Sequence, residues 1–143
     1  MPLVPTADLL HAAVGRRTGL AAFNVVLLET AEALVDAAEE TGLPVILQIS
    51  QNCVAYHGAL EPIAEATLAL AHRSSAHVAV HLDHAEDAQL ARRAVELGFG
   101  SVMFDGSRLP YAENVAATAA VASAMPRVIA RAPRGRPSPS RGT

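Results

Sequence analysis

The stretch HLDHAED, residues 81–87, places two histidines and three acidic residues directly after an apolar run. Histidine nitrogen suits zinc and aspartate can accept or return a proton, so the composition suits metal-assisted proton transfer. Asp83 and His84 lie where the apolar run ends, a position from which both could reach one cavity. Glu86 and Asp87 begin the next helical pattern, and we expect them to interact with its amino end. Chance explains the Asp83–His84 pair equally well, because a zinc site needs about three protein ligands.

Polar residues also follow the other apolar runs, and the order of elements explains why they could meet. Apolar content and β-branched residues predict buried strands over 20–26, 44–50, 77–83 and 100–105, and spacing predicts helices over 7–16, 29–41, 60–73, 88–97 and 111–124. Residues 51–58 read as a polar connection, and Thr6 as a cap of the first helix. Strands that alternate with helices predict a parallel α/β sheet, either open and doubly wound or a (β/α)8 barrel. In both architectures the carboxyl edge of the sheet carries function.

Composition restricts the class of protein further. The 143 residues suffice for one domain, and no apolar stretch reaches the ~20 residues of a membrane span. The first residues lack the pattern of a signal peptide and Cys53 is the single cysteine, so we expect a cytoplasmic protein without a disulfide. The chain contains no lysine, which excludes a lysine Schiff base. Carbonyl chemistry would therefore need a metal or another cofactor.

Residues 126–143 differ in kind from the rest of the chain. They contain five arginines, four prolines and no acidic residue, whereas residues 1–125 contain fourteen acids and six arginines. Such a segment cannot pack as a helix or strand, so we predict a folded domain over 1–125 and a disordered tail over 126–143. A basic tail could bind nucleic acid or an acidic partner, but we expect neither here. An out-of-frame origin would also produce an Arg/Pro-rich string.

Four segments together resemble one family: LAAFNV, PVILQIS, VAVHLDH and GFGSVMFDGSRLPYAENV. Their order and spacing are similar, over about residues 3–125, to the class II, zinc-dependent ketose-bisphosphate aldolases, which include fructose- and tagatose-bisphosphate aldolases. The resemblance implies a (β/α)8-barrel lyase of carbohydrate metabolism. Such an enzyme uses Zn²⁺ to cleave a ketose 1,6-bisphosphate reversibly into dihydroxyacetone phosphate and an aldehyde. The absence of lysine agrees independently with a metal-dependent route.

The resemblance also implies roles for individual residues. Asp83 matches the general acid/base and His84 a catalytic zinc ligand, while Asp105 lies near a second metal position of some members. Ser50 matches a residue that holds the aldehyde side of the substrate, and Asn24 and Gln48 match polar positions that line the same pocket.

Several of these residues have structural alternatives. Asp105 could simply begin a turn before Gly106, and Ser50 could cap a helix or loop. His81 is more easily explained as a hydrogen-bonded core histidine than as a ligand, and Arg108 as a solvated loop residue.

The chain departs from the family in length. Eight βα units need ~250 residues, whereas this sequence provides four. The two other zinc-binding histidines and the glycine-rich phosphate loops normally lie in the second half. We therefore expect a partial barrel of about four βα units, from a truncated gene product that is inactive alone.

The alternative is a non-catalytic half-barrel that binds metal or assembles with a partner chain, and a homo-oligomer would also cover its open edges. A flavodoxin-like domain is disfavoured, because no glycine-rich loop follows the first strand.

Overall fold

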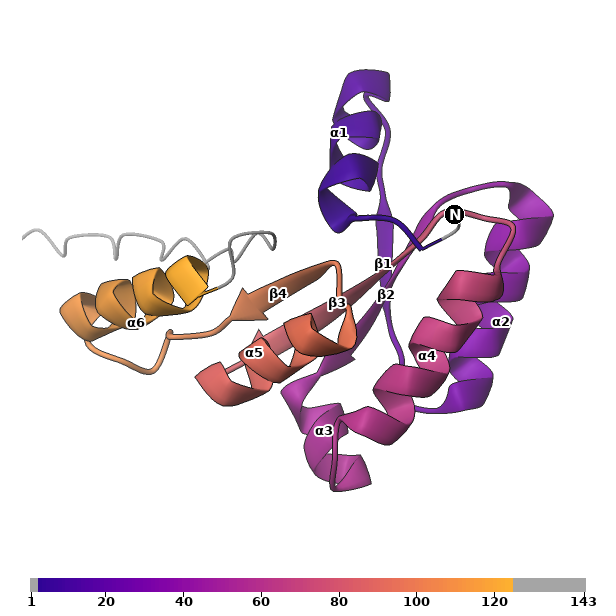
Figure 1. Ribbon diagram of the computed structural model, residues 1–143. Helices are drawn as coiled ribbons and strands as arrows, with labels where there is room; N and C mark the ends of the chain where they lie inside the picture. The colour runs from indigo at the N-terminus through magenta and orange to yellow at the C-terminus, as the bar shows by residue number, and fades with distance from the viewer. Residues whose placement is uncertain (1–2, 125–143) are drawn as a thin grey trace, which may run out of the picture.

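The computed structural model describes residues 3–124, and its strands form one parallel sheet. The strands are β1 (Ala21–Asn24), β2 (Val45–Ser50), β3 (Val78–Ala85) and β4 (Ser101–Phe104), and they are neighbours in chain order (Figure 1). The helices are α1 (Thr6–Arg16), α2 (Leu28–Thr41), α3 (Gln51–His57), α4 (Glu61–Arg73), α5 (Ala88–Leu97) and α6 (Tyr111–Ala124). This arrangement confirms the predicted α/β fold with four βα units.

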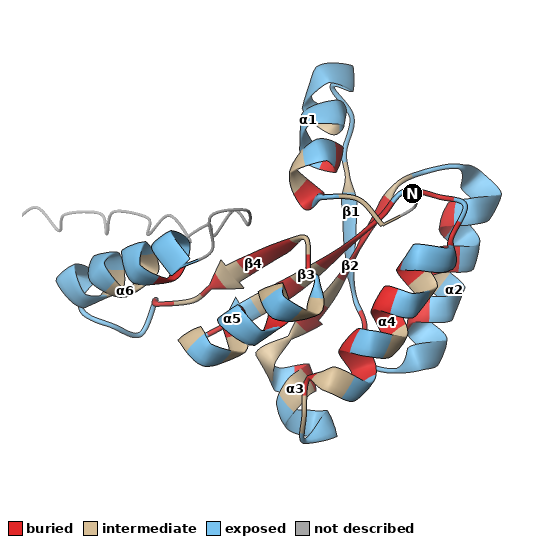
Figure 2. Cartoon of the chain, viewed as in Figure 1, coloured by how far each residue is buried: buried red, intermediate tan, exposed pale blue. Residues whose placement is uncertain are grey.

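Alternation along the strands separates the two faces of the sheet. Leu47 and Ile49 of β2, like Val80 and Leu82 of β3, are fully buried against the helices. The larger core lies between this face and α2, α4 and α5, as the buried residues in Figure 2 show. Residues of the opposite parity face the other way, so the inner face of the sheet carries the polar side chains.

Helix α1 covers the amino end of the inner face. Leu9 packs with Ile46 and Ala79 in a second, smaller apolar cluster. The hydroxyl of Ser101 donates to Thr6 Oγ1 at 2.8 Å and lies 2.7 Å from His81 Nδ1. A chain of polar side chains therefore joins α1 to β3 and β4, and burial lowers the pKa of His81. His81 is thus a hydrogen-bonded core histidine, as we predicted.

Four local predictions need correction. Residues 51–57 form the helix α3 instead of a polar connection, with Ser50 as its amino-terminal cap and Gly58 in the left-handed conformation at its end. Strand β3 continues beyond the expected residue 83 to Ala85. Thr6 does not cap α1: Pro5 holds that position, and the Thr6 hydroxyl bonds to Ser101 instead. Strand β1 is also shorter than the predicted run of 20–26.

Strand β1 is the least covered of the four strands. All four residues of β1 are exposed, including Phe23 at 47%. Helix α6 buries Val121 but leaves Tyr111 and Val115 exposed. No helix among residues 3–124 is long and apolar enough to cross a membrane. The predicted disordered tail, 126–143, lies outside the described residues.

Candidate active site at the carboxyl edge of the sheet

A row of polar side chains crosses the carboxyl edge from β1 to β3. The side-chain amide of Gln48 donates to Asn24 Oδ1 at 2.8 Å and lies 3.4 Å from Asp83 Oδ2. The register explains this row, because Asn24 pairs with Gln48 and Gln48 with His81, two residues before Asp83 on the same face. Gln48 therefore links a β1 amide to a β3 carboxylate, and the side chain of Asp83 is only 18% exposed.

Asp83 and His84 reach the same edge because β3 contains an irregularity. Pairing with β4 shifts register between Leu82 and Ala85, and His84 adopts φ of 48°, in the left-handed region. A non-glycine residue rarely occupies that region, and such backbone is concentrated at functional sites. A regular strand would send neighbouring side chains to opposite faces. The irregularity instead leaves His84 Nε2 3.9 Å from Asp83 Oδ1.

Asp105 holds the other side of the His84 ring. Its Oδ2 lies 2.9 Å from His84 Nδ1, and its Oδ1 accepts a hydrogen bond from the backbone N–H of Ser107 at 2.9 Å. Hydrogen bonds from Ser107, and then the one with His84, lower the pKa of Asp105 to about 2. The hydrogen bond with Asp105 in turn raises the pKa of His84. The pair fixes the imidazole with Nε2 directed away from Asp105.

The loop that carries Asp105 packs closely against the Asn114 side chain of α6 at Gly106. A Cβ on Gly106 would collide with the side-chain amide of Asn114 in α6, whose Oδ1 also accepts from Thr118 Oγ1 at 3.0 Å. Asp105 begins a turn, because its Oδ1 accepts from the backbone N–H of Ser107, and its Oδ2 also contacts His84. The two interpretations of Asp105 do not exclude each other.

Ser50 has a structural role that the sequence had left open. Its Oγ accepts from the backbone N–H of Cys53 at 3.2 Å and caps α3. A serine hydroxyl that accepts one hydrogen bond can still donate another. The cap is therefore compatible with substrate binding by Ser50, which stays a prediction.

The sequence did not predict the role of Gln51 in α3, and it predicted the wrong partner for Glu86. Gln51 Oε1 accepts from the backbone N–H groups of Glu86 and Asp87 and so ties α3 to the loop after β3. Asp87 caps α5, as expected, but Glu86 pairs with Arg108 at 3.3 Å instead. The serine at residue 50, a preferred N-cap residue, and the glycine at residue 58 were the available signals for α3.

The donor atoms at this edge fit one coordination position of a zinc ion. A histidine that gives one nitrogen to a carboxylate and keeps the other accessible is the usual arrangement of a zinc-bound histidine, and the His84 side chain is 62% exposed. Within residues 3–124, however, no group of three or more histidine, cysteine, aspartate or glutamate side chains could hold a metal. Residues 125–143 contain none of these four residue types. The described site therefore supplies an incomplete zinc ligand set.

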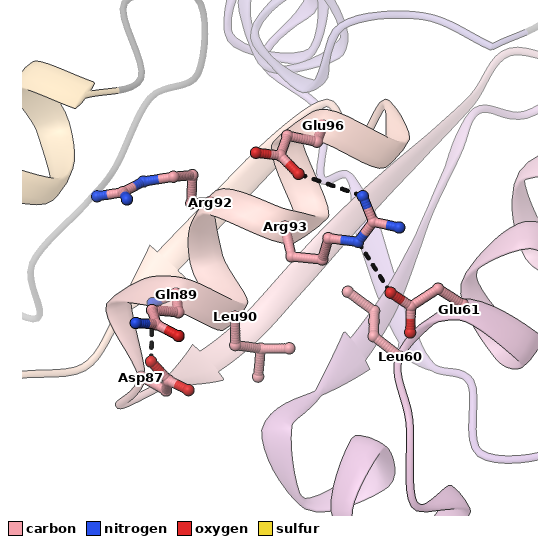
Figure 3. Close-up of a pocket in the computed structure, with 8 residues that line it drawn as sticks. All are labelled: Leu60, Glu61, Asp87, Gln89, Leu90, Arg92, Arg93 and Glu96. Carbon is pink, nitrogen blue, oxygen red and sulfur yellow. Dashed lines mark hydrogen bonds and ion pairs between the residues drawn. The ribbon is translucent and has the colours of Figure 1, made fainter.

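Two hollows of the described residues lie next to or apart from this row of side chains. One of about 260 Å³ opens on the inner face and is lined by Gln48, His81 and Ser101 among others. The second lies between α4 and α5, where Arg93 bonds to Glu61 and Glu96 while Arg92 points away (Figure 3). Except for Gln48, none of the predicted site residues lines either hollow.

Comparison with known proteins gives a consistent result. The family model for class II fructose-bisphosphate aldolase matches residues 4–129. The fructose-bisphosphate aldolase of Treponema pallidum is 41% identical over 80% of this chain, and the sulfofructosephosphate aldolase of Alkalicoccus urumqiensis is 36% identical over 87%. The crystal structure of the YdjI aldolase from Escherichia coli K12 superposes with a TM-score of 0.78 at 25% identity, covering 85% of this chain and 46% of that one. The chain spans only 36% and 43% of the two curated relatives.

Proposed function

Because the chain belongs to the class II fructose-bisphosphate aldolase family, we propose that Asp83 and His84 are the proton-transfer and zinc-binding residues of an aldolase site. The reaction is reversible aldol cleavage of a ketose 1,6-bisphosphate into dihydroxyacetone phosphate and an aldehyde. One observation carries the proposal: the irregularity in β3 brings a carboxylate and an accessible imidazole nitrogen to the same edge, 3.9 Å apart.

Asp83 is the group that moves the proton. A carboxylate can take the proton of a substrate hydroxyl during cleavage and return it during condensation. The amide of Gln48 lies beside Oδ2 and fixes the carboxylate, which leaves Oδ1 on the side of His84. Asn24 Oδ1 accepts the other hydrogen bond of the same amide and so orients it. The row therefore presents one defined carboxylate oxygen to a substrate.

His84 is the residue that would hold zinc through Nε2, with Asp105 as its orienting partner. A carboxylate that accepts from Nδ1 keeps the proton on that nitrogen, so Nε2 retains its lone pair. When bound, zinc would stabilise the negative charge that C–C cleavage leaves on the substrate oxygens. We also propose Asp105 as an oxygen donor near a second metal position, in keeping with its pKa of about 2.

Substrate contacts follow from the same edge. We propose that Asn24, Gln48 and Ser50 contact the sugar chain, because their polar atoms flank Asp83 in register. The relatives are named for different sugar phosphates, including sulfofructosephosphate. Both fructose 1,6-bisphosphate and tagatose 1,6-bisphosphate should be tested as substrates.

The isolated 143-residue chain is proposed to be inactive. A catalytic zinc site uses about three protein ligands, and only His84 and its carboxylate neighbours are available among the described residues. Zinc would be bound weakly and would not be fixed in orientation. A polypeptide that supplies further histidines should complete the site.

The test measures aldol cleavage with zinc and with a chelator. The chain alone should give no turnover above background, whereas mixing it with the part of the Treponema pallidum relative outside the matched segment should give zinc-dependent cleavage. Asp83→Asn and His84→Ala should abolish that activity, and Asp36→Asn on α2 serves as the control. Zinc-dependent turnover by the isolated chain, or full activity of Asp83→Asn, would overturn the proposal.

A second candidate role is assembly with another chain, favoured by the exposed apolar residues at the two ends of the sheet. Phe23 and Leu43 line a groove beside β1 and α2, and Tyr111 is 86% exposed on α6. Light scattering over a range of concentrations, with Phe23→Glu as the disrupting variant, tests whether the chain pairs with a second copy. A monomer at all concentrations would reject this homo-oligomer.

A further inference from the structure

The segment between β1 and α2 is held by few of its own side chains. Val25 is buried, but Val26 and Leu27 are 44% and 47% exposed, and Leu27 caps α2 without a side-chain hydrogen bond. Strand β1 is short, exposed along its length and paired on one side only, to β2. Apolar burial therefore anchors Val25 but contributes little to fixing Val26 and Leu27.

Two side chains of α3 hold this segment through its carbonyl oxygens. The thiol of Cys53 contacts Val25 O at 3.3 Å, and His57 Nε2 lies 2.6 Å from Val26 O. A carbonyl oxygen can only accept, so Nε2 of His57 carries the donated proton. Cys53 is itself placed by the Ser50 cap of the same helix. Both contacts join segments that are remote in sequence, so α3 fixes the path of the chain after β1.

We infer that His57, supported by Cys53, is a positioning residue for the Asn24–Gln48–Asp83 row. Val25 N–H donates to Gln48 O at 2.8 Å, so the clamped segment is continuous with the backbone of the row. Asn24 precedes the clamped carbonyls directly, and its side chain accepts from Gln48. Release of Val26 would leave Val25 as the remaining anchor of this segment, and the Asn24 side chain that directs the Gln48 amide toward Asp83 would be held less firmly.

The importance of this row for catalysis rests on the proposed role of Asp83, but the placement of Gln48 does not. The experiment therefore uses a spectroscopic readout. Solvent exchange and chemical shifts of the Gln48 and Asn24 side-chain amides are measured by NMR in the full chain. His57→Ala should speed exchange of the Gln48 amide by about twofold to tenfold, the effect of one neutral hydrogen bond. His57→Gln retains an N–H donor and should restore much of the slow exchange.

The controls separate positioning from stability. His72→Ala removes an exposed histidine from the last turn of α4 and should leave both amides unchanged. His57 is exposed, so His57→Ala should unfold within a few degrees of the parent protein. Unchanged Gln48 and Asn24 amides in His57→Ala would overturn the inference. A failure of the aldolase assay with the NMR effect intact would reject the proposed activity alone.

Discussion

Replacement of Asp105 by asparagine should weaken the protein most at mildly acidic pH. Asparagine keeps the shape and an acceptor oxygen but removes the charge. Hydrogen bonds from Ser107 and His84 hold the pKa of Asp105 at about 2, compared with 3.8 in the unfolded chain. A shift of this size corresponds to at most about 2.5 kcal/mol at ~1.4 kcal/mol per unit. Because the His84 partner is 62% exposed, solvent screening reduces the expected loss to about 1 kcal/mol.

The pH window follows from the sign of each shift. The pKa of Asp105 is lowered, so its contribution is present above 3.8 and is lost as pH falls toward 2. The pKa of His84 is raised, so its contribution is present below 6.5 and is lost as pH rises through the folded value. The stability difference between parent and Asp105→Asn should therefore be largest between about pH 4 and 6.5.

Urea unfolding of chelator-treated protein at pH 3, 5.5 and 8.5 measures this difference, and an NMR titration follows the His84 ring. The pKa of His84 should fall in Asp105→Asn, because the hydrogen bond with the Asp105 carboxylate is the largest cause of its raised pKa. Asp36→Asn, an exposed aspartate of α2, controls for general loss of charge. An unchanged His84 titration, or a stability difference that does not vary with pH, would refute the assignment of this pair.

Three further substitutions test local features. Thr67 is fully buried in α4, and its hydroxyl has no hydrogen-bond partner among the described residues. Thr67→Val should therefore raise the free energy of unfolding by about 1 kcal/mol. A lower free energy of unfolding in urea would contradict this. Ser50→Ala removes the cap of α3 and should cost about 1 kcal/mol by the same measurement, with Ser50→Thr losing less; equal stability of both would contradict the cap. Gly106→Ala should displace the Asp105 loop and perturb the His84 NMR signals, and adding Asn114→Ala should reverse this; silent His84 signals would refute the steric argument.

The sheet could be predicted from sequence because its information is local. The apolar, β-branched runs at 44–50 and 77–83 predict buried strands. The helical segments between them predict parallel pairing. Helix α3 could not be predicted in the same way. Seven residues are too few to form a stable helix alone, and α3 is held by contacts such as those of Gln51 with the loop after β3.

The residues that meet at the carboxyl edge could be located from the sequence, but their orientation could not. The polar endings of the runs identified Asp83 and His84. Their shared direction depends on the shifted pairing of Ala85 with Phe104, which is set by another strand. The contact of Asp105 with His84 is also a product of tertiary structure, since the two residues are 21 positions apart. From the sequence alone, Asp105 could be interpreted either as the start of a turn or as a residue near a second metal position.

The bond between Ser101 and Thr6 joins residues 95 positions apart, which constrains the order in which the chain can fold. Closing a flexible loop of that length costs about 4 kcal/mol of entropy, more than one neutral hydrogen bond returns. The pairing of Leu3 with Val78 and the packing of Leu9 must therefore supply most of the free energy that docks α1, together with its bond to β4. During synthesis from the amino end, α1 emerges early but waits for most of the sheet before it can dock. Its amides should be among the last of the helical amides to gain protection in pulse-labelled refolding.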